Sequence, residues 1–137
     1  MSTVIPLSGR FGVRVSREGD NAYVEIGGVI AGGNAQNIAA TDCGKAITNE
    51  GESGSASART KSLPAAVAGL FYDVHDINGN LIRARAAAGD TIEQDDDVSV
   101  AAGYIESTGK GWCHLVCLAD GVWTAYALKG IWEVETA

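Results

Sequence analysis

The chain has 137 residues and a mass of 14.1 kDa, with 46% hydrophobic and 20% charged residues. This length predicts one domain. On folding, a domain of this size buries about two thirds of the surface that its unfolded chain exposes, so it needs no metal ion or disulfide bond for stability. The 18 glycines and 2 prolines exclude a collagen-like, coiled-coil or wholly disordered chain and favour short strands joined by turns.

The charge is acidic, with 10 Lys and Arg against 17 Asp and Glu, a formal net charge of −7. Phosphate backbones and anionic lipid surfaces attract clustered cations, and the one tight basic pair is Arg83 with Arg85. The first residues, MSTVIPLSGR, lack the apolar run of a signal peptide, and no stretch is long enough to span a bilayer. We therefore expect no nucleic-acid partner, no membrane association and synthesis in a cytosol.

The three cysteines, Cys43, Cys113 and Cys117, are odd in number and lack disulfide spacing. Such a pattern predicts reduced thiols. On one strand Cys113 and Cys117 would be about 13 Å apart, at about 3.3 Å per residue, which is too far for a disulfide.

The N-terminal part divides into an extended arm and the start of the domain. Pro6 opposes a helix in residues 1–10, which we predict to be an extended arm, followed by a single β domain over residues 11–137. Alternating apolar residues in 11–16 and 22–26 predict a hairpin with one buried face.

The segment after this hairpin carries weaker signals. The glycine-rich residues 27–33 predict a turn or bulge, because a phosphate-binding loop would need a following Lys-Ser/Thr and a helix. Weak strand signals follow at 38–40 and 46–48, and the small polar residues 50–59 predict an exposed, mobile loop. Residues 63–70 predict either one helical turn or a turn that leads into a strand.

The strongest hairpin signal is the dipeptide Asn78-Gly79 between two strand-like segments, 71–77 and 80–86. Asn-Gly favours a type I′ turn. The predicted register then places three pairs opposite one another: His75 with Ile82, Val74 with Arg83, and Tyr72 with Arg85.

The remaining third of the chain predicts an acidic turn at 90–97 and four strands. These strands are Val98–Ile105, Trp112–Leu118, Val122–Leu128 and Ile131–Glu135. Residues 112–118 are apolar on both faces, which indicates a central strand or one covered by another subunit. The fold class predicted is all-β: an antiparallel β-sandwich or barrel-like domain of about ten short strands.

Candidate catalytic and metal-binding residues are few. A nucleophile needs an adjacent, oriented base, but Cys113 and His114 are neighbours on opposite strand faces, and His75 is the only other histidine. The same alternation turns His114 away from the thiols that could otherwise join it in a zinc site. We expect packed histidines, buried cysteines, no catalysis and no zinc.

Two acidic segments have residue types that could supply oxygen ligands to calcium. The Asp76–Asn80 segment lacks the position-12 Glu of an EF-hand, and its glycine comes two residues early. Asp90–Asp97 is interpreted as a solvated turn, with weak calcium binding there left open. We expect no cofactor and no metal.

Three tryptophans, Trp112, Trp123 and Trp132, lie near the C-terminal end of the sequence. Tryptophan anchors β-cores and subunit interfaces, and it also forms platforms for sugars. The interpretation favoured here is core or subunit interface; a sugar platform is the alternative.

Several short motifs occur in a characteristic order. They are TDCGK (41–45), TNEG (48–51), LPAAVAGL (63–70), GDTI (89–92), AAGYIES (101–107), HLVCLADGVW (114–123) and GIWEVE (130–135). In this order they resemble small β-rich virion structural proteins of tailed bacteriophages, namely capsid decoration (cement) proteins, with similar domains in tail fibres. The resemblance covers residues 41–135, and the first 40 residues do not share it.

The resemblance implies a non-enzymatic capsid decoration protein, made in the bacterial host cytoplasm and located on the capsid exterior of the virion. It would bind the major capsid protein as a homotrimer and stabilise contacts between capsid subunits. Capsid binding is assigned to Val4, Ile5, Pro6, Leu7 and Phe11, and core or trimer contacts to Trp112, Trp123, Tyr126 and Trp132. The alternative is a tail-fibre or spike-type receptor-binding module for host surface glycan.

Overall fold

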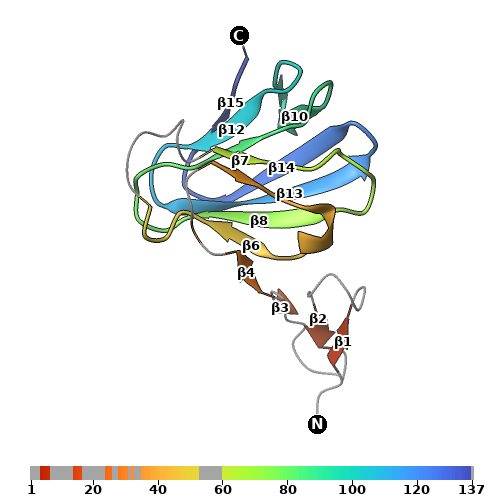
Figure 1. Cartoon of the computed structure of the whole chain (residues 1–137), viewed down its shortest axis with the longest axis vertical. Coiled ribbons are helices and arrows are strands. Elements are labelled where there is room, and N and C mark those ends of the chain that lie inside the picture. Colours follow the sequence, from red (N-terminus) through yellow and green to blue (C-terminus); the bar gives the residue numbers. More distant parts are fainter. Residues whose placement is uncertain are drawn as a thin grey trace.

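The structure, a computed structural model, describes residues 4–6, 14–16, 24–25, 28–30, 32, 35–52 and 60–136. These residues form an all-β fold, as predicted, and their strands make three sheets (Figure 1). The large sheet has the order β11-β10-β14-β13-β8-β6-β4 and the small sheet the order β15-β12-β9-β7-β5. A separate three-stranded sheet has the order β1-β2-β3.

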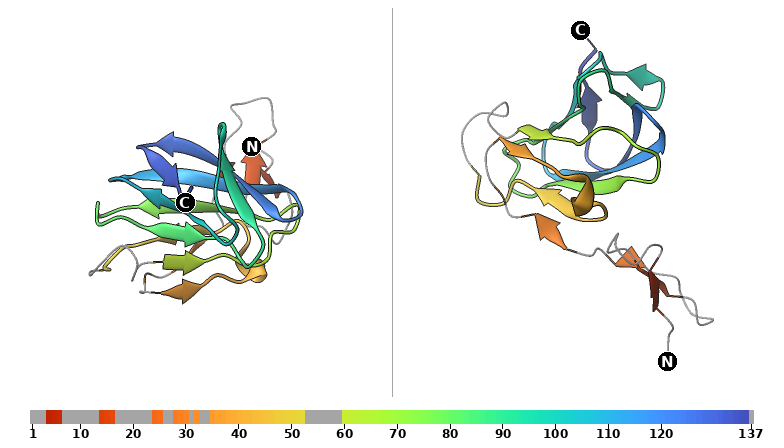
Figure 2. Two further views of the ribbon diagram at one scale, coloured as in Figure 1. Left: turned by 90° about the horizontal axis from the view of Figure 1, so that it is seen from above. Right: turned by 45° about the vertical axis from the view of Figure 1, so that its right-hand side comes forward.

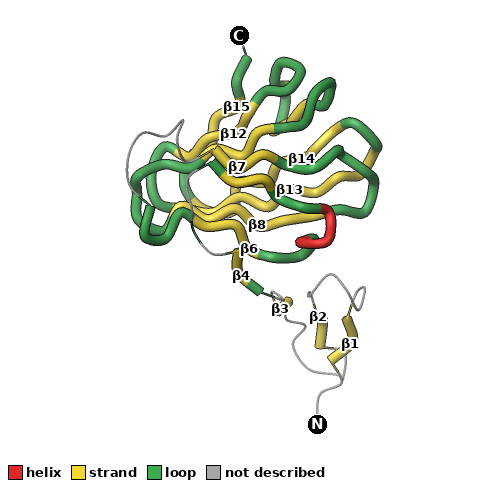
Figure 3. Tube along the Cα trace, viewed as in Figure 1, coloured by secondary structure: helices red, strands yellow, loops and turns green. Residues whose placement is uncertain are grey.

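The strands of the large sheet are β4 (Val29–Ile30), β6 (Ala46–Thr48), β8 (Phe71–Asp76), β10 (Thr91–Gln94), β11 (Asp97–Val98), β13 (Gly111–Ala119) and β14 (Val122–Lys129). Those of the small sheet are β5 (Gln36–Asn37), β7 (Thr60–Ser62), β9 (Arg83–Arg85), β12 (Tyr104–Ser107) and β15 (Trp132–Val134). The third sheet contains β1 (Val4–Pro6), β2 (Arg14–Ser16) and β3 (Val24–Glu25). A single 3-10 turn, η1 (Ala40–Asp42), is the one helical element of the described residues (Figure 3).

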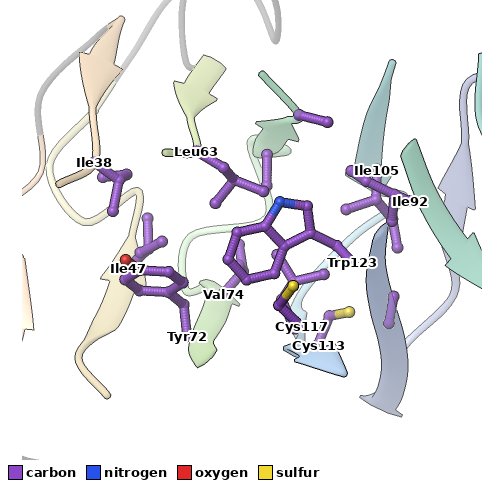
Figure 4. Packing of buried hydrophobic residues seen from close by; sticks show 14 of the residues in the cluster. Ile38, Ile47, Leu63, Tyr72, Val74, Ile92, Ile105, Cys113, Cys117 and Trp123 are labelled. Carbon is purple, nitrogen blue, oxygen red and sulfur yellow. The ribbon is translucent and has the colours of Figure 1, made fainter. Parts of the chain in front are cut away.

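The large and small sheets face each other across one hydrophobic core, which makes the domain a sandwich (Figure 2). Strand alternation sends Tyr72, Val74 and Trp123 inward from the large sheet, and Leu63 and Ile105 enter from the opposite side (Figure 4). Tyr72 and Trp123 pack with their ring centroids 5.8 Å apart. The core therefore gathers residues from segments that are distant in the sequence.

The sheets are mixed rather than purely antiparallel. β13 is antiparallel to both β8 and β14, but β4, β6 and β8 run parallel, as do β5, β7 and β9. From β4 to β9 the chain alternates between the two sheets, so every second strand enters the same sheet in the same direction. Crossover connections of this kind give parallel neighbours, whereas tight hairpins give antiparallel ones.

The hairpin predicted around Asn78-Gly79 is wrong. β8 and β9 belong to different sheets, and the chain between them crosses from one to the other. His75 therefore lies opposite Trp112 and Thr48 instead of Ile82.

The other two predicted cross-strand pairs are absent for the same reason. Val74 lies opposite Cys113 and Ile47, and Tyr72 lies opposite Leu115. Arg83 and Arg85 pair instead with β12 of the small sheet.

The crossing is held by the buried carboxylate of Asp76. Its Oδ1 accepts hydrogen bonds from Asn49 Nδ2 at 2.9 Å and from the backbone N–H of Gly79 at 2.8 Å. Its Oδ2 accepts from Ser107 Oγ at 2.7 Å and from the backbone N–H of Leu81 at 3.1 Å. Side-chain acceptance of these N–H groups replaces the hairpin ladder and directs the chain toward β9.

Three further boundaries differ from the prediction. Residues 38–40 lead into η1 instead of forming a strand. The acidic segment 90–97 contains β10, which pairs parallel to β14, and its turn is tightened by a positive φ of 53° at Asp95. The predicted strand 98–105 is broken, because β11 ends at Val98 and β12 begins at Tyr104. Residues 63–70 form the predicted turn that leads into a strand.

The predicted N-terminal hairpin is confirmed by the pairing of β2 with β3, in which Arg14 lies opposite Glu25. β1 adds to this hairpin, with Val4 opposite Ser16. Leu7, Phe11 and residues 53–59 of the predicted loop lie outside the described residues. Within the described part of the chain, no helix is long and apolar enough to cross a membrane.

Candidate functional site

The candidate site is the face of the large sheet that points away from the core. β13 is a central strand between β8 and β14, as predicted. Its alternation buries Cys113, Leu115 and Cys117 and turns the intervening residues outward. We define the outer face by these outward residues of the three strands: Phe71, Asp73 and His75; Trp112, His114, Val116 and Leu118; Thr124, Tyr126 and Leu128.

Apolar side chains on this face are accessible. Trp112 is 38% exposed, Tyr126 49%, Leu128 60% and Leu118 66%. His114 lies opposite Tyr126, and a register shift beside Trp112 places Lys129 opposite the tryptophan. The exposed residues thus lie on two adjacent strands of the same face.

An aromatic stack crosses from β8 to β13. The rings of His75 and Trp112 are 5.7 Å apart with an interplanar angle of 28°. Lys129 Nζ lies 6.0 Å from the centre of the Trp112 ring, within reach of a cation–π contact. Burial lowers the pKa of His75, with the charge of Asp73 acting in the opposite direction, so the environment favours the neutral imidazole.

A polar pair lies in the middle of the outer face. His114 Nδ1 is 2.7 Å from Asp73 Oδ1, and both side chains are partly buried. The ring of Phe71 also lies near the imidazole, with the two ring centroids 6.0 Å apart. The carboxylate and the phenyl ring together fix the orientation of His114.

A hollow of about 300 Å³ adjoins the stack where β4, β6 and β8 meet. Its lining residues are Gly28, Val29, Ala46, Thr48, Glu50, His75 and Ile77. His75 Nε2 is buried and has no hydrogen-bond partner among the described residues. Glu50 and Thr48 are thus the polar lining residues of the hollow beside the ring of His75.

The histidines have no activated thiol beside them. Cys113 follows Trp112 but points into the core, and burial raises its pKa to about 12. Burial also raises the pKa of Cys43 and Cys117. All three cysteines are free, as predicted, and act as small apolar core residues. The described residues contain no group of three or more His, Cys, Asp or Glu arranged to hold a metal ion.

The four aromatic residues predicted to form core or trimer contacts divide between two locations. Trp123 and Trp132 are buried in the core, whereas Trp112 and Tyr126 lie on the outer face. Of the residues assigned to capsid binding, Val4, Ile5 and Pro6 form β1, and the other two lie outside the described residues.

Sequence reasoning missed the contribution of β8 to this face and the pairing of β8 with β6 and β13. It placed His75 opposite Ile82 and gave no partner to Asp73, because both were assigned to a local hairpin. The alternation of Phe71–His75 was visible, but its partners, Thr48 and Trp112, come from segments on either side of the crossing.

The outer face of the small sheet differs in character. Arg83 forms an ion pair with Glu106, and Arg85 Nη1 lies 3.6 Å from Glu135 Oε1. Both guanidinium groups also cover the ring of Tyr104, at 4.2 and 5.1 Å from its centre. The one tight basic pair of the sequence is therefore neutralised within its own sheet, which leaves the apolar outer face of the large sheet as the candidate for contacts with other molecules.

The sequence matches no protein-family model, and a comparison with curated proteins finds no match.

Proposed function

We propose that the protein is a non-enzymatic structural protein of a tailed-bacteriophage virion: a capsid decoration protein on the capsid exterior. It binds the assembled shell as a trimer and stabilises contacts between major capsid proteins. Two things support the proposal, the ordered phage-like motifs of residues 41–135 and the exposed apolar outer face of the large sheet. The outer face is the observation that carries it.

The outer face is suited to contact between copies. Soluble monomers rarely expose large contiguous apolar patches, and tryptophan and tyrosine are enriched where proteins meet. Trp112 and Tyr126 supply such anchors, flanked by Leu118 and Leu128. Lys129 and the Asp73–His114 pair give the patch polar groups that fix the register of a partner copy.

In this proposal the N-terminal segment, including β1, binds the major capsid protein. Ligands that bind only the assembled shell stabilise it by mass action, because disassembly must also release them. The net charge of −7 gives the exposed surface of the decorated particle the repulsion that keeps particles apart.

Light scattering of the purified protein tests the trimer. The wild type is expected at three times the chain mass, and the double variant Tyr126→Ser/Leu128→Ser at the mass of a monomer. Val100→Ser, an exposed apolar residue at 39% outside the outer face, is the matched control and keeps the trimer. A wild type that is strictly monomeric at all concentrations contradicts the proposed assembly.

Incubation with expanded capsids that lack decoration proteins tests the partner. Saturable binding is expected, together with a higher capsid melting temperature, and deletion of residues 1–10 should abolish both. If the wild type does not bind such capsids, the decoration function is wrong. If the deletion binds as well as the wild type, the assignment of the N-terminal segment is wrong.

A second function, a receptor-binding module for host glycan, is favoured by one specific observation. Sugar rings stack on tryptophan and hydrogen-bond to nearby polar groups, and Trp112 lies next to a hollow lined by Glu50, Thr48 and His75. A glycan array distinguishes the two functions. Specific hits lost in Trp112→Ala support the receptor module, and an empty array leaves the decoration protein as the proposal.

A further inference from the structure

Lys61 is a buried amine held between a carboxylate and a carboxamide. Its side chain is 0% exposed, and Nζ lies 2.7 Å from Glu52 Oε2, whose side chain is 3% exposed. Nζ also lies 2.6 Å from Gln36 Oε1. The parallel pairing of β5 with β7 places Gln36 directly opposite Lys61, so the backbone fixes this proximity.

We propose that Lys61 and Gln36 form an intramolecular isopeptide bond, with Glu52 as the proton-transfer group. A C=O bond is about 1.23 Å long, so Gln36 Cδ lies within about 3.8 Å of Lys61 Nζ. Productive intramolecular attack needs the reacting atoms about 3–3.5 Å apart, which a small rotation of the amide reaches. The inference stands independently of the proposed function.

The reaction begins with a proton transfer along the 2.7 Å contact, from the Lys61 ammonium to the Glu52 carboxylate. This step converts a buried ion pair into a neutral amine and a neutral acid, so it leaves no separated charges in the buried site. Neutral lysine is a competent nucleophile for a carbonyl carbon.

The amine lone pair then forms a new N–C bond at Gln36 Cδ, and the carbonyl π electrons move to the oxygen. Glu52 gives its proton to the carboxamide nitrogen and takes one from the attacking nitrogen. The original C–N bond breaks, ammonia leaves and the carbonyl re-forms. Glu52 ends as the neutral acid, and ammonia leaves as NH₃ and takes up a proton from water only after it has reached solvent, so the products in the protein are an amide and a protonated Glu52.

The second oxygen of Glu52 supports this assignment. Oε1 is buried and has no hydrogen-bond partner among the described residues, which is an unfavourable state for one oxygen of a permanent carboxylate. As the neutral acid, Glu52 has a hydroxyl that can donate to the new amide carbonyl. The bond would also secure β5, a two-residue strand at the edge of the small sheet.

The experiment is intact mass spectrometry of the full-length protein, followed by tryptic mapping. The expected mass is that of the sequence, corrected for any removal of Met1, minus one ammonia. Trypsin should release residues 18–45 joined to residues 60–83 and should not cleave after Lys61. Glu52→Gln and Lys61→Met should show the full sequence mass.

One alternative source of ammonia loss needs its own control. Asn78-Gly79 can close to a succinimide, which also loses one ammonia, so Asn78→Ser is the matched variant. The isopeptide predicts that Asn78→Ser keeps the mass deficit and the branched peptide. The proposal is overturned if folded wild type shows the full mass, or if trypsin cleaves after Lys61 and releases only linear peptides. The tryptic peptide map of the wild-type protein tests the isopeptide bond even if the Lys61 or Glu52 variant does not fold.

Discussion

Asp76→Ala should be among the most destabilising single substitutions in the chain. The Asp76 side chain accepts four hydrogen bonds where the chain crosses between the sheets, and the residue is 3% exposed. Alanine would leave these donors without their acceptor. A buried donor that loses its partner costs about 1–3 kcal/mol.

The size of the stability loss expected for Asp76→Ala depends on how deeply the four donors are buried. Asn49 and Ser107 are buried, so they account for two such penalties. The N–H groups of Gly79 and Leu81 form partly buried bonds, and water can replace part of their loss. The expected decrease in the free energy of unfolding is about 3–5 kcal/mol, a large fraction of the 5–15 kcal/mol typical of a domain.

Urea unfolding followed by tryptophan fluorescence measures this change. Asp96→Ala, at an exposed residue in the β10–β11 turn, is the control and should change stability by less than about 0.5 kcal/mol. Asp76→Asn keeps one acceptor oxygen but turns an NH₂ group toward two of the donors, so it should fall between alanine and the wild type. A decrease below about 1 kcal/mol for Asp76→Ala, with an unchanged m-value, would refute the view that this carboxylate holds the crossing.

Three other measurements test the structure. Burial lowers the pKa of His75 below its ordinary 6.5, so the unfolded chain takes up more protons than the folded one as the pH falls through that value. Stability should therefore be greater at about pH 7.5 than at about pH 5.5, with a smaller difference in His75→Gln, as measured by urea midpoints at the two pH values. The three buried thiols should react with a thiol reagent only after unfolding, and fast labelling of native Cys113 would contradict its burial. Gly111→Ala should lower the urea midpoint, because a Cβ there would clash with the backbone carbonyl of Lys129; an unchanged midpoint would show that the β13–β14 end can relax.

The sequence predicted local features and missed the long-range ones. The apolar segments 112–118 and 122–128 correctly indicated β13 and β14, which form a hairpin joined by a short turn. The turn signal at Asn78-Gly79 failed, because the preference of Asn-Gly for a hairpin turn is statistical and competes with tertiary contacts. There Asp76, Asn49 and Ser107 supply the hydrogen bonds that a hairpin ladder would have supplied.

The candidate site shows the same limit. The sequence grouped Trp112 and Tyr126 with Trp123 and Trp132, and only the register of β13 with β14 separates the two outward residues from the two buried ones. Their neighbours on β8 could not be predicted, because parallel partners joined by crossovers leave no short-range signal in the sequence. The buried Lys61 was hidden for a related reason: Gln36 becomes its neighbour only through the crossover pairing of β5 with β7, and the contact with Glu52 is likewise tertiary.

The two features hidden from sequence reasoning depend on one topological fact. Between β4 and β9 the chain alternates between the sheets, so each crossing must satisfy its polar groups without a hairpin ladder. Asp76 does this at the β8–β9 crossing, and it directly follows His75, whose ring stacks on Trp112. Because adjacent residues of a strand point to opposite faces, fixing Asp76 inside the sandwich also fixes His75 on the outer face. The β8–β9 crossing, where a hairpin was wrongly predicted, therefore also positions His75 to stack on Trp112 in the candidate interface.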